Sequence, residues 1–284
     1  MRARLETYAS FVRFSHSVFA LPFALAGALL ASRLVPFSWV RIAWIIACMV
    51  AARSAAMGFN RLVDAHHDAR NPRTAMREIP RGALSRREAT WFVVLWSIVF
   101  VMCAGAISRL CLALAPVALA IVFWYSLAKR YTSYTQLFLG LAMAVAPVGG
   151  WIATGAPLRL EPWVLGVAIG AWVGGFDILY ACQDLEFDRR EGLRSIPVRF
   201  GIARSLALSR AVHVLAVVAL WWVGRLAGLG WVYTAGVAVV GLLLIYEQSL
   251  VRVDDLSQVK RAFDLNGWVG VLYLAATIVD VFLL

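Results

Sequence analysis

Two groups of acidic and amide side chains lie next to stretches of the chain that are otherwise apolar. The first group contains Asn60, Asp64 and Asp68, and the second contains Asp184 and Asp188. Within each group the residues are spaced by four, so on a helix each set lies along one face. Carboxylates that face one another repel unless a cation lies between them, and ligands that offer only oxygen favour a hard ion. The sequence therefore predicts a Mg²⁺ site built from these five residues.

Basic side chains that could bind phosphate follow both acidic groups. Arg73 and Arg77 come after the first group, Arg189 directly follows the second, and Lys129 ends an apolar stretch between them. Arginine is a permanently charged, bidentate donor suited to phosphate oxygens. Carboxylates that hold a metal, beside cations that neutralise the remaining charge, are what a metal-bridged diphosphate requires. We predict that these four residues bind a substrate diphosphate.

Two further charged residues lie deeper in apolar stretches. Arg53 comes seven residues before Asn60, and Asp177 comes seven residues before Asp184, so each shares a helical face with its group. Arg53 could simply extend its side chain to the membrane interface. It lies about two turns from the end of its stretch, roughly 10 Å deep, and we expect it to bind a substrate carboxylate instead. Charged groups at such depth are usually functional.

The rest of the chain predicts an all-α, polytopic membrane protein. Of its 284 residues, 62% are hydrophobic, and the mean hydropathy is +0.78. A helix that crosses a bilayer needs about 20 apolar residues. Nine stretches meet this requirement: 14–33, 39–59, 89–107, 110–127, 136–154, 163–183, 205–224, 231–249 and 265–284. We expect nine transmembrane helices in one bundle around a central cavity that faces the cytoplasm, and one domain over residues 1–284.

The basic residues predict the orientation of this bundle. In a nine-span arrangement, 20 of the 27 Lys and Arg residues fall on one side and five on the other. Such an imbalance places the richer side in the cytoplasm. The N-terminus and two long active-site loops, 60–88 and 184–204, are then cytoplasmic, and the C-terminus lies outside. Topology and anionic lipid account for the net charge of +11, so no nucleic-acid partner is expected.

Both acidic groups match motifs of a known family. The segments NRLVDAHHD (60–68) and DLEFD (184–188) resemble the N-D-x-x-D-x-x-x-D and D-x-x-x-D motifs of the UbiA-type intramembrane aromatic prenyltransferases. The resemblance extends over essentially the whole chain. One departure is Arg61, which stands where the family motif has its second-position Asp. Position 61 points about 100° away from the face of Asn60, Asp64 and Asp68, so metal binding should survive.

The resemblance implies a reaction and its substrates. A polyprenyl group would be transferred from polyprenyl diphosphate, with Mg²⁺, to an aromatic hydroxy-carboxylate in a bacterial inner membrane. The chain looks most like the branch linked to menaquinone made through futalosine, with 1,4-dihydroxy-6-naphthoate as acceptor. The wider family uses 4-hydroxybenzoate, as in ubiquinone biosynthesis. The predicted catalytic residues are Arg53, for the acceptor carboxylate, and Asp64 or Asp177, for the phenol.

Three other readings compete with this one. Intramembrane charges such as Arg53 and Asp177 also occur in transporters, although the acids here lie at the predicted inner edge rather than at the midplane. Lipid phosphotransferases also use metal-binding Asp clusters, but they usually concentrate them in one motif. A prenyltransferase for haem or chlorophyll would take a bulky macrocycle and should not need Arg53.

Overall fold

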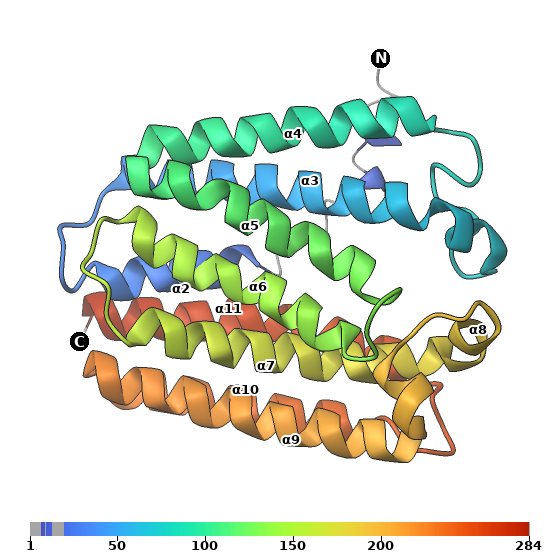
Figure 1. Ribbon diagram of the computed structural model, residues 1–284. Helices are drawn as coiled ribbons and strands as arrows, with labels where there is room; N and C mark the ends of the chain where they lie inside the picture. Colours follow the sequence, from blue (N-terminus) through green and yellow to red (C-terminus); the bar gives the residue numbers. More distant parts are fainter. Residues whose placement is uncertain (1–6, 9, 13–19, 284) are drawn as a thin grey trace.

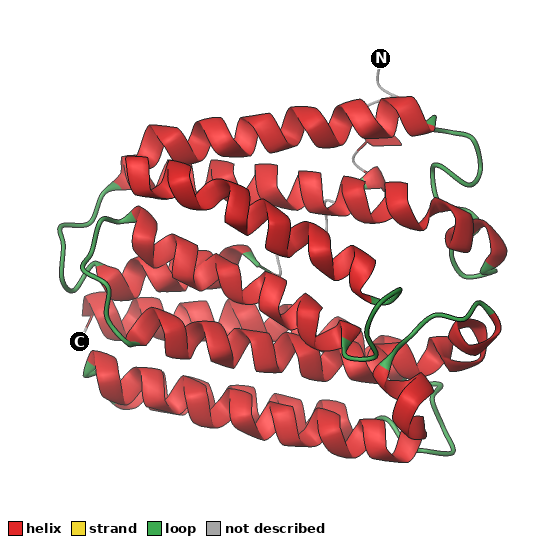
Figure 2. Cartoon of the chain, in the orientation of Figure 1, coloured by secondary structure: helices red, strands yellow, loops and turns green. Residues whose placement is uncertain are grey.

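The computed structural model describes residues 7, 8, 10–12 and 20–283, and the regular structure in these residues is entirely helical (Figures 1 and 2). Eight helical segments in this part are long and apolar enough to cross a membrane. They comprise α3 (Trp39–Arg70), α4 (Arg86–Ile107), α5 (Arg109–Ala128), α6 (Thr135–Ala153), α7 (Glu161–Ala181) with its extension to Arg190, α9 (Ile196–Ala227), α10 (Trp231–Ser249) and α11 (Val259–Leu283).

A shorter apolar helix, α2 (Leu21–Ala31), corresponds to the first predicted span, 14–33. Residues 13–19 and the N-terminal arginines that entered the topology prediction lie outside the described residues. The predicted count of nine spans and the predicted central cavity therefore stay predictions. An all-helical membrane protein, by contrast, is confirmed.

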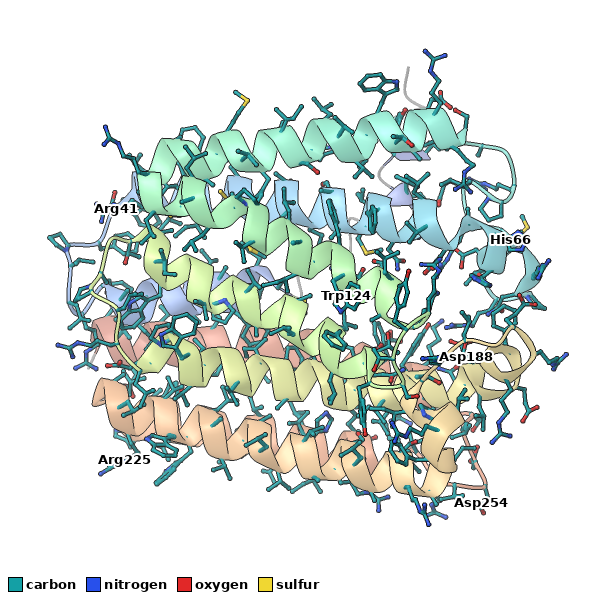
Figure 3. All side chains as sticks on the ribbon, viewed as in Figure 1. Arg41, His66, Trp124, Asp188, Arg225 and Asp254 are labelled. Atoms are coloured by element: carbon teal, nitrogen blue, oxygen red, sulfur yellow. The ribbon has the colours of Figure 1, made fainter. Side chains whose placement is uncertain are left out.

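Successive helices run in opposite directions, so the connections gather at two ends of the bundle (Figure 1). One end carries the long connection 71–85 and the segment 182–195. We call it the polar end, because Asn60, Asp64, Asp68, Asp184 and Asp188 all lie there. His66, Asp188 and Asp254 mark this end in Figure 3, and Arg41 and Arg225 mark the opposite end. The opposite end has shorter connections, such as Gly228–Gly230 between α9 and α10.

Two helices extend well beyond the apolar stretches that predict them. Helix α3 begins after Ser38, whose side chain accepts from the backbone N–H of Arg41, and continues to Arg70. Helix α9 begins at Ile196, where Ser195 caps it. It bends at Gly201, whose positive φ of 76° is a backbone conformation that glycine adopts readily and other residues rarely adopt. The predicted loops 60–88 and 184–204 are therefore too long. The part of the first that lies outside regular helix is 71–85, which forms turns, and the second contains α8 (Leu185–Arg190) and the first turns of α9.

Small residues bring the central helices close together. A Cβ atom at Gly150 of α6 would collide with the backbone carbonyl of Ala24 in α2, and one at Gly140 would collide with the carbonyl of Gly170 in α7. Membrane helices gain little from the hydrophobic effect against lipid, so close backbone packing is a main source of their association. Gly149, beside Gly150, faces open space instead.

Helix α7 lies at the centre of this packing. In its span, 67% of the most apolar stretch is buried, a larger share than in any other described span. A chain of hydrogen bonds holds its backbone. Gln248 of α10 donates to Ser209 Oγ at 2.7 Å and to His213 Nδ1 at 3.0 Å, both in α9. Ser209 then donates to the Gly175 carbonyl at 2.8 Å, and His213 Nε2 lies 3.2 Å from the Trp172 carbonyl.

This packing predicts opposite effects for the same substitution at two neighbouring positions. Gly150→Ala should lower the free energy of unfolding by about 1–3 kcal/mol, because α2 and α6 must separate to admit the methyl group. Gly149→Ala should leave it unchanged or raise it slightly, because alanine favours helix and meets no neighbour there. The thermal midpoint of the purified protein in detergent measures both. Equal midpoints for the two variants would contradict the close packing of α2 on α6.

Candidate active site

The first acidic group lies in the last three turns of α3. Asp64 and Asp68 are buried, with 3% and 7% of their surface exposed. The amide nitrogen of Asn60 donates to Asp64 Oδ2 at 3.2 Å and lies 3.3 Å from Ser126 Oγ of α5. The amide oxygen of Asn60 is therefore the atom left to coordinate a cation. The three residues share a face, as their spacing predicts.

Basic side chains from two other segments neutralise these carboxylates. Lys129 Nζ lies 2.7 Å from Asp64 Oδ2, and Arg130 contacts Asp64 Oδ1 at 3.3 Å. One nitrogen of Arg77 lies 2.8 Å from both oxygens of Asp68. Unpaired carboxylates in such surroundings would carry a large desolvation penalty, and these contacts offset it. The structure thus places the predicted Lys129 and Arg77 directly on the predicted metal ligands.

The second acidic group faces the first across the polar end. Asp184 ends a 3-10 turn (η2, Cys182–Asp184), and Asp188 lies in the short helix α8 (Leu185–Arg190). Arg73, from the connection that follows the first group, forms an ion pair with Asp184 and a hydrogen bond to the hydroxyl of Tyr180. Lys129 interacts electrostatically with Asp184 and Asp188 in addition to its contact with Asp64. The two groups therefore belong to one site.

The two deeper charged residues lie around a tyrosine of α5. Asp177 of α7 is within electrostatic range of Asp184, Asp188 and Arg73. Tyr125 interacts electrostatically with both Asp177 and Arg53. Arg53 of α3 and Asp177 of α7 thus lie within electrostatic range of the same tyrosine.

Two basic residues depart from what the sequence predicts. Arg189 pairs with Glu186 of its own helix at 3.7 Å, and half of its side chain is exposed, so the structure does not bring it onto the acidic groups. Arg130 was absent from the predicted site, yet it reaches Asp64 and also donates to the Val63 carbonyl at 2.8 Å. In the sequence Arg130 serves only as a topology signal, although its place directly after Lys129 at the end of an apolar span is the available clue to this contact.

A further contact joins the chain segments that follow the two acidic groups. Glu191, just after α8, lies 3.0 Å from Arg70 and 3.4 Å from Nδ1 of His67, both in the last turn of α3. The hydrogen bond from Arg70, with help from His67, holds the pKa of Glu191 below its ordinary value of 4.5. Glu191 therefore connects the end of α3 to the end of α8 through charged contacts.

The predicted metal ligands offer the type of donor atom that magnesium prefers. Asn60, Asp64, Asp68, Asp184 and Asp188 offer only oxygen, which a hard divalent cation prefers. The ammonium and guanidinium groups on three of these carboxylates show that positive charge is stabilised at these positions. Among the described residues, no three His, Cys, Asp or Glu side chains are already grouped closely enough to hold a metal ion.

Comparison with known proteins identifies the family. The model of the UbiA prenyltransferase family matches residues 20–271. The chain belongs to the UbiA prenyltransferase family. A 4-hydroxybenzoate octaprenyltransferase of Citrobacter koseri is 34% identical to this UbiA-family chain over 238 residues, which cover 81% of each protein. The enzyme of the same name from Salmonella paratyphi B is 33% identical over the same length and coverage.

Solved structures share the fold of this UbiA-family protein. The apo structure of a UbiA homolog from Aeropyrum pernix K1 superposes with a TM-score of 0.86 at 36% identity, covering 94% of this chain and 98% of the other. A UbiA homolog from Archaeoglobus fulgidus, whose structure is bound to GPP and Mg²⁺, superposes with a TM-score of 0.73 at 19% identity. The superposition covers 97% of this chain and 99% of the other chain. At this low identity it shows a shared fold.

The contacts of Glu191 with Arg70 and His67 predict how the stability of the protein depends on pH. Because the pKa of Glu191 is lower in the folded protein than in the unfolded chain, its stabilisation is present above pH 4.5 and is lost as the pH falls through the folded value. The thermal midpoint of Glu191→Gln should therefore lie below that of the unmodified protein near neutral pH, and the difference should vanish in acid.

Glu186→Gln is the matched control, because Glu186 is a largely exposed carboxylate one turn away. It should change the midpoint little at any pH, as is usual for exposed ion pairs. A midpoint difference for Glu191→Gln that persists in acid would show that the charge of Glu191 is not what joins the two helices.

Proposed function

We propose that this protein transfers a polyprenyl group from polyprenyl diphosphate to an aromatic hydroxy-carboxylate, with Mg²⁺ as cofactor. The observation that carries the proposal is the convergence of Asn60 and four carboxylates with Arg73, Arg77 and Lys129 at one end of an apolar bundle. A long prenyl tail requires apolar surroundings, and its diphosphate requires paired metal and basic groups. The names of the relatives support the same class of reaction. We treat residues 1–284 as one prenyltransferase domain.

The charge of the site supports a metal diphosphate as ligand. Four carboxylates of the two acidic groups face four basic side chains, Arg73, Arg77, Lys129 and Arg130. The deeper pair, Asp177 and Arg53, adds one charge of each sign. A site already near neutrality accepts most readily a ligand that is itself near neutral, and a diphosphate with its divalent counterions meets that condition. The carboxylates would bind the cations, and the basic side chains would move to the phosphate oxygens.

The proposed mechanism divides the work among these residues. Asn60, Asp64, Asp68, Asp184 and Asp188 would hold the metal. Magnesium, when bound, supplies positive charge that stabilises the diphosphate as it leaves. Arg73, Arg77 and Lys129, with Arg130, would bind the remaining phosphate oxygens and stabilise the same developing charge. Arg189, directed to Glu186, has a smaller part in this scheme.

The acceptor would lie on the apolar side of the carboxylates. There Arg53 can bind its carboxylate, and Asp177 can accept a hydrogen bond from its phenol, which raises the electron density of the ring. We favour Asp177 over Asp64 for the phenol, because Asp64 is engaged by both Lys129 and Arg130. The ring would attack the allylic carbon as the C1–O bond breaks, with water excluded by the apolar walls. The proton then lost from the ring restores its aromaticity.

The surroundings of the reaction follow from the charge distribution. We propose that the polar end faces the cytoplasm of a bacterium, with the prenyl tail in the inner-membrane lipid and the C-terminus outside. In the predicted nine-span arrangement twenty basic residues fall on that side, which supports this orientation. Menaquinone and ubiquinone biosynthesis both contain a step of this kind, and the acceptor decides between them.

Removing single carboxylate charges tests the metal site. Asp64→Asn and Asp184→Asn keep the side-chain shape but remove one ligand charge from each acidic group. Prenyl transfer should fall by about 10²- to 10³-fold or more in either variant, while the protein still inserts and purifies. Asp254→Asn is the control, because Asp254 is exposed at the same end, outside both groups (Figure 3). Near-normal turnover by either of the first two variants would contradict the metal assignment.

An acceptor assay tests the reaction itself. Membranes that contain the protein would receive polyprenyl diphosphate with either 1,4-dihydroxy-6-naphthoate or 4-hydroxybenzoate, with and without EDTA. A prenylated product that EDTA abolishes is the expected result, and the preferred acceptor assigns the pathway. Absence of product with both acceptors, from folded protein, would contradict the proposed substrate class.

A further inference from the structure

Arg61 lies in sequence inside the first acidic group but is directed away from it. It stands between Asn60 and Asp64 on α3, where the resembling motif has an acid. Its side chain is 5% exposed and forms an ion pair with Glu78 Oε2 at 2.8 Å. The side chain of Glu78 is equally buried. Within the described residues, this is the pair in which both charged side chains are most deeply buried.

Glu78 connects three separate segments of the chain. It belongs to the 71–85 connection and directly follows Arg77. Its second oxygen, Oε1, accepts a hydrogen bond from Ser10 Oγ of the N-terminal segment at 2.6 Å. One carboxylate therefore holds α3, the connection and the N-terminal segment together. The two carboxylate oxygens are each used by a different partner.

The same connection carries the two arginines that contact the acidic groups. Arg77 reaches Asp68, and Arg73 reaches Asp184. A second tether, from Thr74 Oγ1 to the Asp68 carbonyl at 3.0 Å, lies between them. A buried ion pair holds its geometry strongly, because moving one partner leaves the other charge without compensation in apolar surroundings. The Arg61–Glu78 pair thus limits how far the connection can shift along α3.

We propose that Arg61 and Glu78 are a positioning pair for diphosphate binding. The pair sets the register of the 71–85 connection on α3, so that Arg73 and Arg77 are directed at the metal-binding carboxylates. Arg61, which departs from the acidic motif, then has a role of its own, because it holds the 71–85 connection through Glu78. This role rests on the proposed function, and it concerns the binding of diphosphate rather than of the aromatic acceptor.

Charge reversal and exchange test the pair kinetically. Arg61→Glu and Glu78→Arg should each raise KM for polyprenyl diphosphate by about tenfold or more, an interaction size that contacting residues commonly show. KM for the acceptor should stay unchanged. The double exchange, which restores an ion pair of reversed order, should recover most of the loss. The milder variant Glu78→Gln keeps the test valid if a reversed charge prevents folding.

Limited trypsin digestion in membranes gives a readout independent of activity. Arg81 is exposed and should be cut in every form, whereas Arg77 is held on Asp68 and should be cut slowly in the unmodified protein. Arg61→Glu leaves the Arg77–Glu78 bond itself unchanged and should accelerate cleavage after Arg77, whereas Arg61→Lys, which keeps a cation for Glu78, should leave it slow. Arg159→Glu, which breaks the loose 3.9 Å pair with Glu161 outside the polar end, is the control and should change neither cleavage nor KM.

The outcomes separate the two hypotheses. Accelerated cleavage in Arg61→Glu but not in Arg61→Lys, in a protein without prenyl transfer, would support the positioning pair and overturn the proposed function. Normal KM in Glu78→Gln together with normal cleavage in Arg61→Glu would overturn the pair while leaving the function intact. Failure of the double exchange to restore KM would also overturn it, because mutual charge would then not be what positions the connection.

Discussion

Four carboxylates gathered at one end of an apolar bundle impose the main electrostatic constraint on this structure. Each repels the others, and at least Asp64 and Asp68 are shielded from water. The chain meets the constraint with cations from two different segments, namely Lys129 and Arg130 after α5, and Arg73 and Arg77 in the 71–85 connection. Balancing charge thereby brings together residues far apart in sequence.

The apolar part of the bundle provides the frame that this charge balance needs. Helix α7 carries Asp177 and leads into Asp184. Its position along the bundle axis therefore sets where the second acidic group lies. Gln248, Ser209 and His213 hold the α7 backbone from one side, and Trp172 of α7 donates to Asn266 of α11 at 2.7 Å. Glycines in α6 allow α2 and α7 to approach from the other. Polar contacts inside the bundle therefore hold α7 in place, and with it the acidic group that follows its last turn.

The sequence predicted the helical class, eight apolar helices long enough to cross a membrane and the faces of the acidic groups, because periodicity and hydropathy determine these directly. It did not predict where α3 and α9 end, since a charged helical turn beyond the lipid has the composition of a loop. Arg189 was assigned to phosphate because it adjoins Asp188, but neighbouring residues on a helix point about 100° apart. Arg61 pairs with Glu78, and Arg130 with Asp64, through tertiary contacts that spacing alone does not encode.

The internal pairing of the carboxylates bears on how folding and the proposed metal binding depend on each other. In small zinc domains the ligands have no other partner, so metal affinity becomes folding free energy and chelators unfold the protein. Here lysine and arginine already compensate the carboxylate charges, so under the proposed function the bundle would fold without the divalent ion. A cell short of magnesium would then hold an intact protein that lacks only its proposed cofactor, and transfer could resume without resynthesis or reinsertion into the membrane.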